Sequence, residues 1–256
     1  MMNFDTLLYE QQDALVTIRL NRPERLNAVN NQMRRDLNAA FDHFVNDSVA
    51  RVGILTGVGR AFCVGRDIKE QAEGQMDNWA VIPDRPPLFV VPRSEKPIVT
   101  AANGHASGLG YYMFNGGDIR VASDTAEFSL PQLQTGLQGC WDMSISQGIP
   151  WAVAVEIQVL GRAFTAARGY ELGLVNKVVP PEQLEECALE YAHALLALPS
   201  VHLAMTMRML REAQPLGSDT MWQKQWANFE YIMTLRDTQE AAAAFAEKRE
   251  PNFTGE

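Results

Sequence analysis

Two glycine-rich segments carry the residues of this chain that are best placed to do chemistry. The first is residues 61–67 (AFCVGRD) and the second is residues 103–110 (NGHASGLG). Each follows an apolar run typical of a buried strand and precedes a predicted helix, so backbone N–H groups point toward a space where negative charge is stabilised. Neither matches the dinucleotide fingerprint or the phosphate-binding P-loop. Each is a candidate anion site, although such a turn on its own is more often structural.

The cysteines and histidines show no metal-binding or nucleophile pattern. Cys63, Cys140 and Cys187 are odd in number and lack CxxC spacing, which fits a reducing compartment and argues against disulfides or structural zinc. Cys63 and Cys140 flank the candidate site without an obvious base, so we expect small buried hydrophobic side chains. His105, inside the second segment, is either a proton shuttle or directed away from the site. We predict no metal site.

Alternating strands and helices are expected to position the two segments. Apolar runs and alternation predict strands at 15–20, 51–56, 97–102, 119–122, 126–130 and 174–179. Helical spacing predicts helices at 30–45, 110–114, 151–160 and 165–173, and a helical pattern from 181 nearly to the end. A short helix at 67–75 and a long lid-like loop at 76–97 are also expected. We predict an α/β core at 1–190 and a C-terminal helical region at 191–256.

Composition and charge limit the classes of function. Of 256 residues, 22 are Lys or Arg and 31 are Asp or Glu, which gives a net charge of −9 at pH 7. Such a surface repels phosphate backbones, so we expect no nucleic-acid partner. The first residues lack a basic signal region, and no apolar run approaches the ~18 residues that span a bilayer. We therefore expect a soluble cytoplasmic protein with no membrane partner.

A set of motifs spread over nearly the whole chain resembles one protein family. The motifs are residues 21–28 (NRPERLNA), 61–69 (AFCVGRDIK), 96–97 (KP), 103–119, 126–131 (AEFSLP), 173–176 (GLVN) and 245–253 (FAEKREPNF). The family is the crotonase superfamily, also called the enoyl-CoA hydratase/isomerase superfamily. The resemblance implies an α/β fold, built as a crotonase-type spiral of ββα turns with a C-terminal helical trimerisation region.

The same resemblance implies a substrate and an assembly. The substrate would be an acyl-coenzyme A (CoA) thioester, with no cofactor beyond the CoA moiety itself. The protein would form a homotrimer or a hexamer made of two trimers. By resemblance the CoA would contact Arg25, Leu26, Ala28, Val64, Arg66, Asp67 and Ile68, with Phe245 and Lys248 reaching it from a neighbouring subunit. Arg25 and Lys248 suit phosphate groups, and the alternative for each is a solvated surface charge.

Two backbone N–H groups hold the thioester oxygen in this family, and the matching residues here are Arg66 and Leu109. A thioester carbonyl that gains enolate or tetrahedral character develops oxyanion charge. Two preorganised donors lower that barrier, and loss of one donor costs ~3–4 kcal/mol. Leu109 stands where many relatives have glycine, so a β-carbon is expected at the pocket.

The general acid and base of the family's hydratases are two glutamates, and their positions here hold Tyr112 and Gln132. An amide exchanges no proton in the relevant range, and a tyrosine with a pKa near 10 is a poor base at neutral pH. Because each such group contributes roughly 10²–10⁴-fold, we expect ordinary hydration to be crippled. Tyr112 is either a hydrogen-bond donor to a developing anion or a satisfied buried aromatic residue.

Asp142 is the candidate replacement for the missing carboxylates. Several relatives that are not hydratases use an aspartate at or near this place. Asp142 would act as a nucleophile or as a base for water, and the alternative is a cap of the helix predicted after it. Trp141 is either a wall for a flat acyl group or part of the core.

Three functions remain open from the sequence. The first is an acyl-CoA enzyme, a lyase, isomerase or hydrolase, that performs decarboxylation, C–C hydrolysis or isomerisation with Asp142. The second is a true hydratase or isomerase whose acid and base come from Glu70, Glu73 or Asp77. The third is a non-catalytic acyl-CoA-binding subunit.

Overall fold

The computed structural model describes residues 3–67, 70, 91–92, 94–136, 148–213, 227–228, 230–247 and 249–255. The chain forms two compact units. The first comprises Met1–Phe128 and Phe164–Gln214, and the second Ser129–Ala163 and Pro215–Glu256. The boundary expected at residue 190 separates the predicted core from the predicted oligomerisation region. It stays a prediction. The helix expected at 67–75 and the loop expected at 76–97 fall largely outside the described residues.

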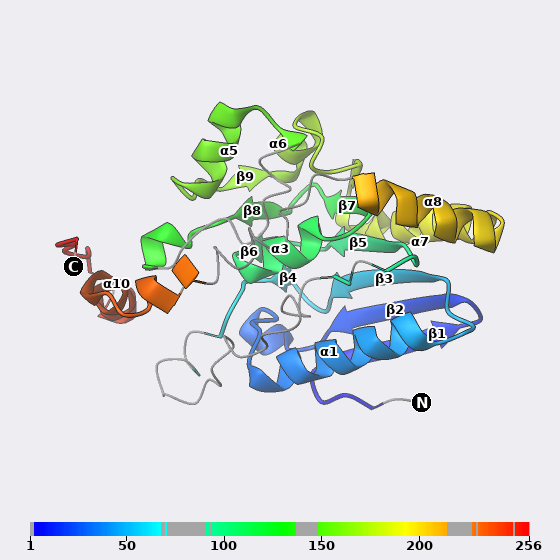
Figure 1. Ribbon diagram of the computed structural model, residues 1–256, viewed down its shortest axis with the longest axis horizontal. Helices are drawn as coiled ribbons and strands as arrows, with labels where there is room; N and C mark the ends of the chain where they lie inside the picture. The colour runs from blue at the N-terminus through cyan, green and yellow to red at the C-terminus, as the bar shows by residue number, and fades with distance from the viewer. Residues whose placement is uncertain are drawn as a thin grey trace. The chain divides into compact units, whose positions relative to one another are not determined.

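A six-stranded sheet lies at the centre of the first unit (Figure 1). Its strands, in spatial order, are β1 (Leu7–Gln12), β2 (Leu15–Leu20), β3 (Val52–Gly57), β5 (Ile98–Ala102), β7 (Ile119–Ser123) and β10 (Lys177–Val179). β1 and β2 are antiparallel, and the remaining pairs are parallel. All five residues of β5 are buried, as expected for a parallel strand covered on both faces. The strands predicted for this sheet are confirmed, and β10 is shorter than expected.

Helices α1 (Asn31–Asn46) and α7 (Leu184–Leu196) cover opposite faces of that sheet. On β3, Val52 and Ile54 belong to the core cluster that includes α7. A β-carbon on the intervening Gly53 would meet the Phe44 ring of α1 at 3.2 Å. Successive residues of a strand point to opposite faces, so the two helices are on different sides. The helix predicted at 30–45 is confirmed.

A four-stranded sheet contains both glycine-rich segments. Its order is β4 (Ala61–Cys63), β6 (His105–Ser107), β8 (Glu127–Ser129) and β9 (Phe164–Thr165). Short helices α3 (Leu109–Asn115) and α6 (Ala166–Glu171) follow β6 and β9. Aromatic rings of Tyr111, Phe114 and Phe128 pack here, with the Phe114 and Phe128 rings stacked at 4.7 Å. The turns expected across 61–67 and 103–110 are wrong in part, because each segment includes a short strand.

The remaining elements are helical. The first unit adds α8 (Ser200–Ala213) and the short helices η1 (Pro23–Arg25) and η3 (Pro181–Gln183). The second unit holds η2 (Leu133–Thr135), α5 (Trp151–Gln158) and α10 (Arg236–Glu247). Within it, a β-carbon on Gly136 would lie 2.6 Å from the Ala241 β-carbon, so α10 packs directly against the end of η2. None of the helices in the described ranges is long and apolar enough to cross a membrane.

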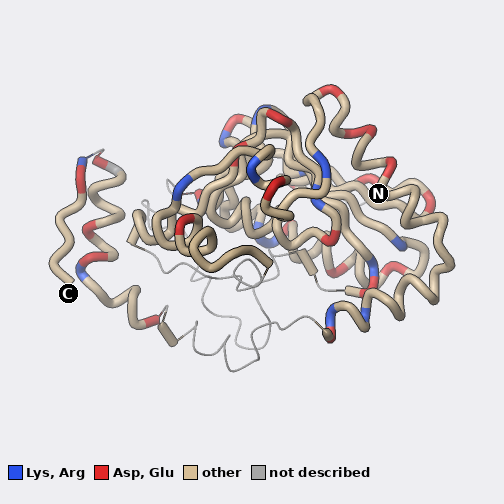
Figure 2. The backbone as a smooth tube through the Cα atoms, turned by 90° about the horizontal axis from the view of Figure 1, so that it is seen from above, with Lys and Arg blue, Asp and Glu red and all other residues tan. Residues whose placement is uncertain are grey.

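Acidic and basic positions are interspersed along the described chain (Figure 2). Several of them form ion pairs, such as Arg211 with Asp118 at 2.9 Å and Arg19 with Glu185 at 2.6 Å. In the part of the chain that the structure describes, the Asp and Glu residues do not form one long run. This distribution is typical of a solvated surface.

Candidate active site

Pairing of β4 with β6 brings the two glycine-rich segments side by side. Ala61 pairs with His105, and Cys63 pairs with Ala106. Just beyond the strands, a β-carbon on Gly65 (φ +98°) would lie 3.5 Å from the Leu109 nitrogen. A β-carbon on Gly110 would lie only 1.9 Å from the Cys63 carbonyl oxygen. The glycines therefore allow two backbones to approach more closely than any side chain would permit.

The N–H of Arg66 is directed by a short parallel bridge between Val29 and Arg66. In this bridge the Val29 N–H donates to the Gly65 carbonyl at 2.7 Å, and the Asp67 N–H donates to the Val29 carbonyl at 2.9 Å. Because the residues on either side of Arg66 make these bonds, its own N–H points to the opposite side, away from Val29. The neighbouring Gly65 is also close to Leu109, as the 3.5 Å distance from a Gly65 β-carbon to the Leu109 nitrogen shows.

The N–H of Leu109 lies at the first position of α3. Its N-cap, Gly108, has φ 53° and ψ −118°, and the first bond of the helix runs from the Tyr112 N–H to the Gly108 carbonyl at 3.1 Å. The first N–H groups of a helix have no acceptor within the helix. Leu109 already has helical backbone, which any L-residue adopts, so leucine in place of glycine does not strain the donor.

The candidate CoA-binding segment 25–28 lies beside the first glycine-rich segment. Arg25 is exposed at the end of η1, while Leu26 (φ 51°) and Asn27 (φ 57°) both take left-handed backbone. The Val64 N–H donates to the Leu26 carbonyl at 3.2 Å. The buried Asn27 side chain donates to the Val58 and Ala61 carbonyls at 3.0 and 2.9 Å. The structure thus brings Leu26 and Ala28 together with Val64, Arg66 and Asp67.

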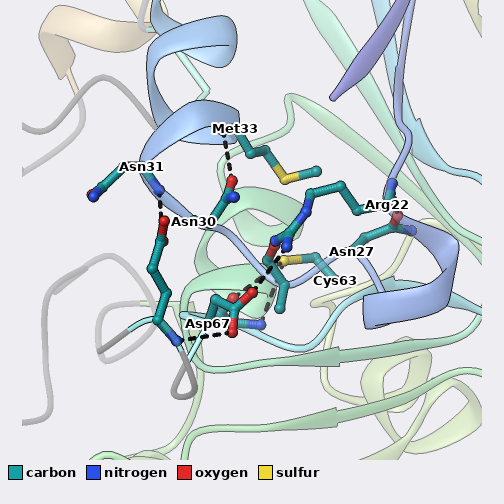
Figure 3. A network of polar contacts seen from close by, with 10 residues as sticks. Arg22, Asn27, Asn30, Asn31, Met33, Cys63 and Asp67 are labelled. Carbon is teal, nitrogen blue, oxygen red and sulfur yellow. Dashed lines mark hydrogen bonds and ion pairs between the residues drawn. The ribbon is translucent and has the colours of Figure 1, made fainter. Parts of the chain in front are cut away.

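The Asp67 carboxylate turns inward, toward Arg22 (Figure 3). Its Oδ2 lies 3.0 Å from Arg22 Nη2, and both side chains are at least 86% buried. The carboxylate is therefore engaged inside the protein, and any contact of Asp67 with CoA would use other atoms. Arg22 itself was not singled out from the sequence, because its partner is 45 residues away. Its only sequence signal is membership of the 21–28 motif.

The Glu70 side chain contacts the first residue of α1, Asn31. Its Oε2 accepts the Asn31 N–H at 3.0 Å, while Asn30, the N-cap of α1, accepts the Met33 N–H at 2.8 Å (Figure 3). This arrangement satisfies helix donors that otherwise lack acceptors. Glu70 is therefore occupied as a helix cap. Glu73 and Asp77 lie outside the described residues.

The positions of the two hydratase glutamates offer no carboxylate. Tyr112 lies on α3, one turn after Leu109, and is 3% exposed. Gln132, in the second unit, is 7% exposed and its Oε1 has no hydrogen-bond partner among the described residues. An unsatisfied buried amide oxygen costs about 1–3 kcal/mol. Such an oxygen is a ready acceptor for a donor on a ligand or water.

Neither Cys63 nor His105 has the surroundings of a catalytic group. Burial raises the pKa of the Cys63 thiol to about 12, so it stays protonated at neutral pH. The His105 Nδ1 lies 3.6 Å from the Glu127 carboxylate, and both side chains are substantially exposed. Within the described ranges, no group of three or more His, Cys, Asp or Glu residues could hold a metal ion.

The structure describes only some of the remaining candidate residues. Phe245 is exposed on α10, which leaves its ring available for a contact. Five of the other residues considered above lie outside the described residues: Ile68, Cys140, Trp141, Asp142 and Lys248. Their roles stay predictions.

Comparison with known proteins gives one consistent family. The family model described as enoyl-CoA hydratase/isomerase matches residues 10–256. The enoyl-CoA hydratase EchA19 of Mycobacterium tuberculosis is 31% identical over 253 residues, covering 96% of this chain and 95% of that protein. The 1,2-epoxyphenylacetyl-CoA isomerase of Escherichia coli is 30% identical over 268 residues, covering 100% of both chains.

Solved structures agree with the sequence relatives. The crystal structure of carnitinyl-CoA hydratase from Mycobacterium avium superposes with a TM-score of 0.90 at 26% identity, covering 99% of this chain and 100% of that chain. The predicted crotonase-type α/β fold is therefore confirmed. The chain belongs to the enoyl-CoA hydratase/isomerase family of the crotonase superfamily, and it is an acyl-CoA-processing member of that family.

Proposed function

We propose that this enzyme holds the carbonyl oxygen of an acyl-CoA thioester between the N–H groups of Arg66 and Leu109. The observation that carries the proposal is the approach of Gly65 to the Leu109 nitrogen, together with the Val29–Arg66 bridge that turns the Arg66 N–H away from Val29. Donors fixed in advance stabilise an oxyanion without reorganising during the reaction. Both belong to the backbone, so the side chains at 66 and 109 are free to vary.

The reaction that we propose is decarboxylation, C–C hydrolysis or isomerisation rather than water addition. Hydration needs an acid and a base at the double bond, and neither Tyr112 nor Gln132 is an effective base at neutral pH. Decarboxylation needs least from side chains, because the electrons of the breaking C–C bond move onto the thioester oxygen as carbon dioxide leaves. In this reaction the Tyr112 hydroxyl would donate a hydrogen bond to the developing anion.

Asp142 would supply the carboxylate for hydrolysis or isomerisation. As a base it would activate water or move a proton, and as a nucleophile it would attack a carbonyl carbon. Replacing Asp142 with asparagine removes both abilities while keeping the shape of the side chain. Unchanged activity of Asp142→Asn would leave decarboxylation as the member of this set that needs no such group.

CoA would lie along Arg25, Leu26 and Ala28, with its phosphates near the exposed Arg25 guanidinium. Phe245 and Lys248 would reach it from a neighbouring subunit of a homotrimer or hexamer. Exposed apolar side chains on α8 support assembly, since Val201, Met205 and Met209 follow one another at four-residue spacing and are 58–68% exposed. A cytoplasmic location is supported by the unpaired, buried Cys63 and Cys187.

Two other functions have specific support. Hydration is favoured by relatives that are named hydratases, including the one from M. tuberculosis, and would need acid and base groups from elsewhere in the chain. A non-catalytic acyl-CoA-binding role is favoured by the loss of both glutamates.

Incubation of the protein with a panel of CoA thioesters separates the proposed reactions from a role in binding alone. The panel contains malonyl-type, β-diketone and 3-enoyl thioesters in D₂O, and mass spectrometry follows each one while the melting temperature reports binding. We expect thermal stabilisation together with loss of carbon dioxide, C–C cleavage or deuterium uptake in one class. Stabilisation without any chemical change would favour the binding module. An absence of both effects would contradict the proposal.

A further inference from the structure

Arg22 joins the two segments from which the proposed site is built. Its Nη1 donates to the Ala28 carbonyl in the candidate CoA segment, and its Nη2 pairs with Asp67 Oδ2 at 3.0 Å, directly after Arg66 (Figure 3). The Arg22 and Asp67 side chains are 14% and 10% exposed. Burial of this kind makes the loss of one partner more costly than at the surface, because the other charge is left buried and unpaired.

The backbone pairing that Arg22 bridges is short. Three hydrogen bonds join residues 26–29 to residues 64–67: Val64 to Leu26 at 3.2 Å, Val29 to Gly65 at 2.7 Å and Asp67 to Val29 at 2.9 Å. The Gly65 φ of +98° lies immediately before Arg66, and glycine there is the most flexible point of the segment. A bridge this short, beside a glycine, needs further contacts if it is to hold the Arg66 N–H in one direction.

Arg22 is itself firmly placed. Its N–H donates to Asn27 Oδ1 at 2.9 Å, and its carbonyl accepts the N–H groups of Arg25 and Asn27 at 2.9 Å each. The left-handed backbone of Leu26 and Asn27 costs energy and persists only where surrounding contacts fix it. The guanidinium therefore reaches Asp67 from a rigid turn.

We infer that Arg22 is a positioning residue for the oxyanion donor: by clamping Asp67 to the Ala28 carbonyl, it holds in place the Val29–Arg66 bridge that directs the Arg66 N–H. The inference rests on the proposed function, because the donor matters only where a thioester oxygen is bound. Arg22 does not touch the thioester in this role. A lysine cannot replace it, since one ammonium lacks the planar fork that serves two acceptors on separate segments.

The test compares Arg22→Lys with Arg19→Lys, the same substitution at an ion pair away from the site. Arg19 also pairs with a carboxylate, Glu185, at 2.6 Å, but its partner lies on α7 rather than beside Arg66. Butanoyl-CoA with a ¹³C-labelled thioester carbonyl serves as the probe. Isotope-edited infrared spectroscopy gives the stretching frequency of the bound carbonyl, which falls when oxyanion-hole donors polarise it, and calorimetry gives the dissociation constant.

We expect the wild type and Arg19→Lys to lower the carbonyl frequency equally. Arg22→Lys is expected to lose most of that shift while its dissociation constant for butanoyl-CoA changes by less than about threefold. With a turned-over thioester, kcat should fall by about 10- to 100-fold with little change in KM, because a donor displaced by about 1 Å loses much of its effect. A merely structural role would instead lower thermal stability and affinity together.

A second variant keeps the inference testable should Arg22→Lys fold poorly. Asp67→Asn removes the charge from the other side of the clamp, and its carbonyl shift should be reduced in the same way. The double variant should lose no more than either single one, since both act through one link. A full carbonyl shift in Arg22→Lys or Asp67→Asn would overturn the positioning role of Arg22 and leave the proposed function standing. An unshifted carbonyl in the wild type would overturn the proposed function as well.

Discussion

At the scale of single residues, the Arg66 N–H is the atom whose removal is most informative. Arg66→Pro deletes this donor and removes neither hydrogen bond of the Val29 bridge, because that bridge uses the Gly65 carbonyl and the Asp67 N–H. We expect kcat to fall by about 10²–10³-fold, the usual effect of losing one oxyanion-hole donor. Steady-state kinetics with a thioester that the protein consumes measures the change.

Arg66→Ala is the matched control for that prediction. It removes the guanidinium and keeps the N–H, so kcat should stay within a few-fold of wild type. Equal losses in Arg66→Ala and Arg66→Pro would mean that the side chain, rather than the backbone donor, does the work. Thermal unfolding of both variants checks that the fold is retained.

The sequence suggested candidate site residues, which stay predictions, but it did not suggest the residues that support them. Arg66, Leu109, Tyr112 and Gln132 came from motifs whose order along the chain is visible in the sequence. The Arg22–Asp67 pair did not, because an ion pair across 45 residues depends on how the chain folds back rather than on local spacing. For the same reason, the sequence did not predict that the Asp67 carboxylate points into the protein, toward Arg22.

At the scale of elements, the close approach of α3 to β4 is the structural condition for the site. A β-carbon at Gly110 would lie 1.9 Å from the Cys63 carbonyl oxygen, so Gly110→Ala must push the two backbones apart. We expect a loss of about 1–3 kcal/mol in the free energy of unfolding, as for other overpacked positions. Activity should fall as well, because Leu109 moves with α3.

Calorimetry of Gly110→Ala beside Gly148→Ala measures this effect. Nothing lies within 4 Å of a β-carbon built on Gly148, so that substitution should leave the melting temperature nearly unchanged. Gly110→Ala should lower it by at least a few degrees. Equal melting temperatures for the two variants would show that α3 and β4 are not packed as closely as described.

A second prediction concerns the segment 249–255 that follows α10. Hydrogen bonding by Arg249 lowers the pKa of Glu240 to about 2, and Glu240 also accepts the Asn252 N–H at 2.8 Å. Backbone bonds from Thr254 and Gly255 lower the pKa of Asp237. Because both carboxyls have lower pKa values in the folded chain, the hydrogen bonds that attach segment 249–255 to α10 are complete above the ordinary carboxyl range. The bonds of Glu240 are lost only as the pH falls toward about 2.

Carbon-13 NMR titration of the Glu240 carboxyl tests that expectation. The resonance should still report the ionised form at pH 4, and the amide of Asn252 should shift together with it below pH 3. Glu240→Gln should leave the Asn252 amide independent of pH in that range. Ordinary titration of Glu240 near its usual value of about 4.5 would contradict the contact.

The elements that the sequence failed to predict are short or polar. β4 and β6 have three residues each, too few for a period, and the glycines around them indicated turns. β1 (LLYEQQ) is mostly exposed and forms by pairing with β2, an effect that no local pattern contains. Long amphipathic or fully buried segments, such as α1 and β5, were predicted because burial alone gives them a clear pattern.

At the scale of the whole molecule, the proposed assembly makes α8 a subunit contact. Met209→Glu would place a charge at one end of its exposed apolar stripe, where Met209 is 68% exposed in the isolated chain. We expect this variant to shift the protein toward monomers, since an unpaired charge is costly to bury. Analytical ultracentrifugation measures the change in mass.

Tyr170→Glu is the control, because Tyr170 is exposed on α6 and lies outside the predicted helical region 191–256. Its mass should match that of the wild type. A monomeric wild-type protein, or a Met209→Glu variant that assembles normally, would contradict the proposed role of α8.

We propose above all that the oxyanion site works without the acid–base pair of a hydratase. Its most direct test is mass spectrometry after incubating crotonyl-CoA, and separately a malonyl-type thioester, with concentrated protein in D₂O. We predict that crotonyl-CoA gains no water, whereas the malonyl-type thioester loses carbon dioxide and takes up deuterium at the carbon left behind. Addition of one water to crotonyl-CoA would contradict the claim.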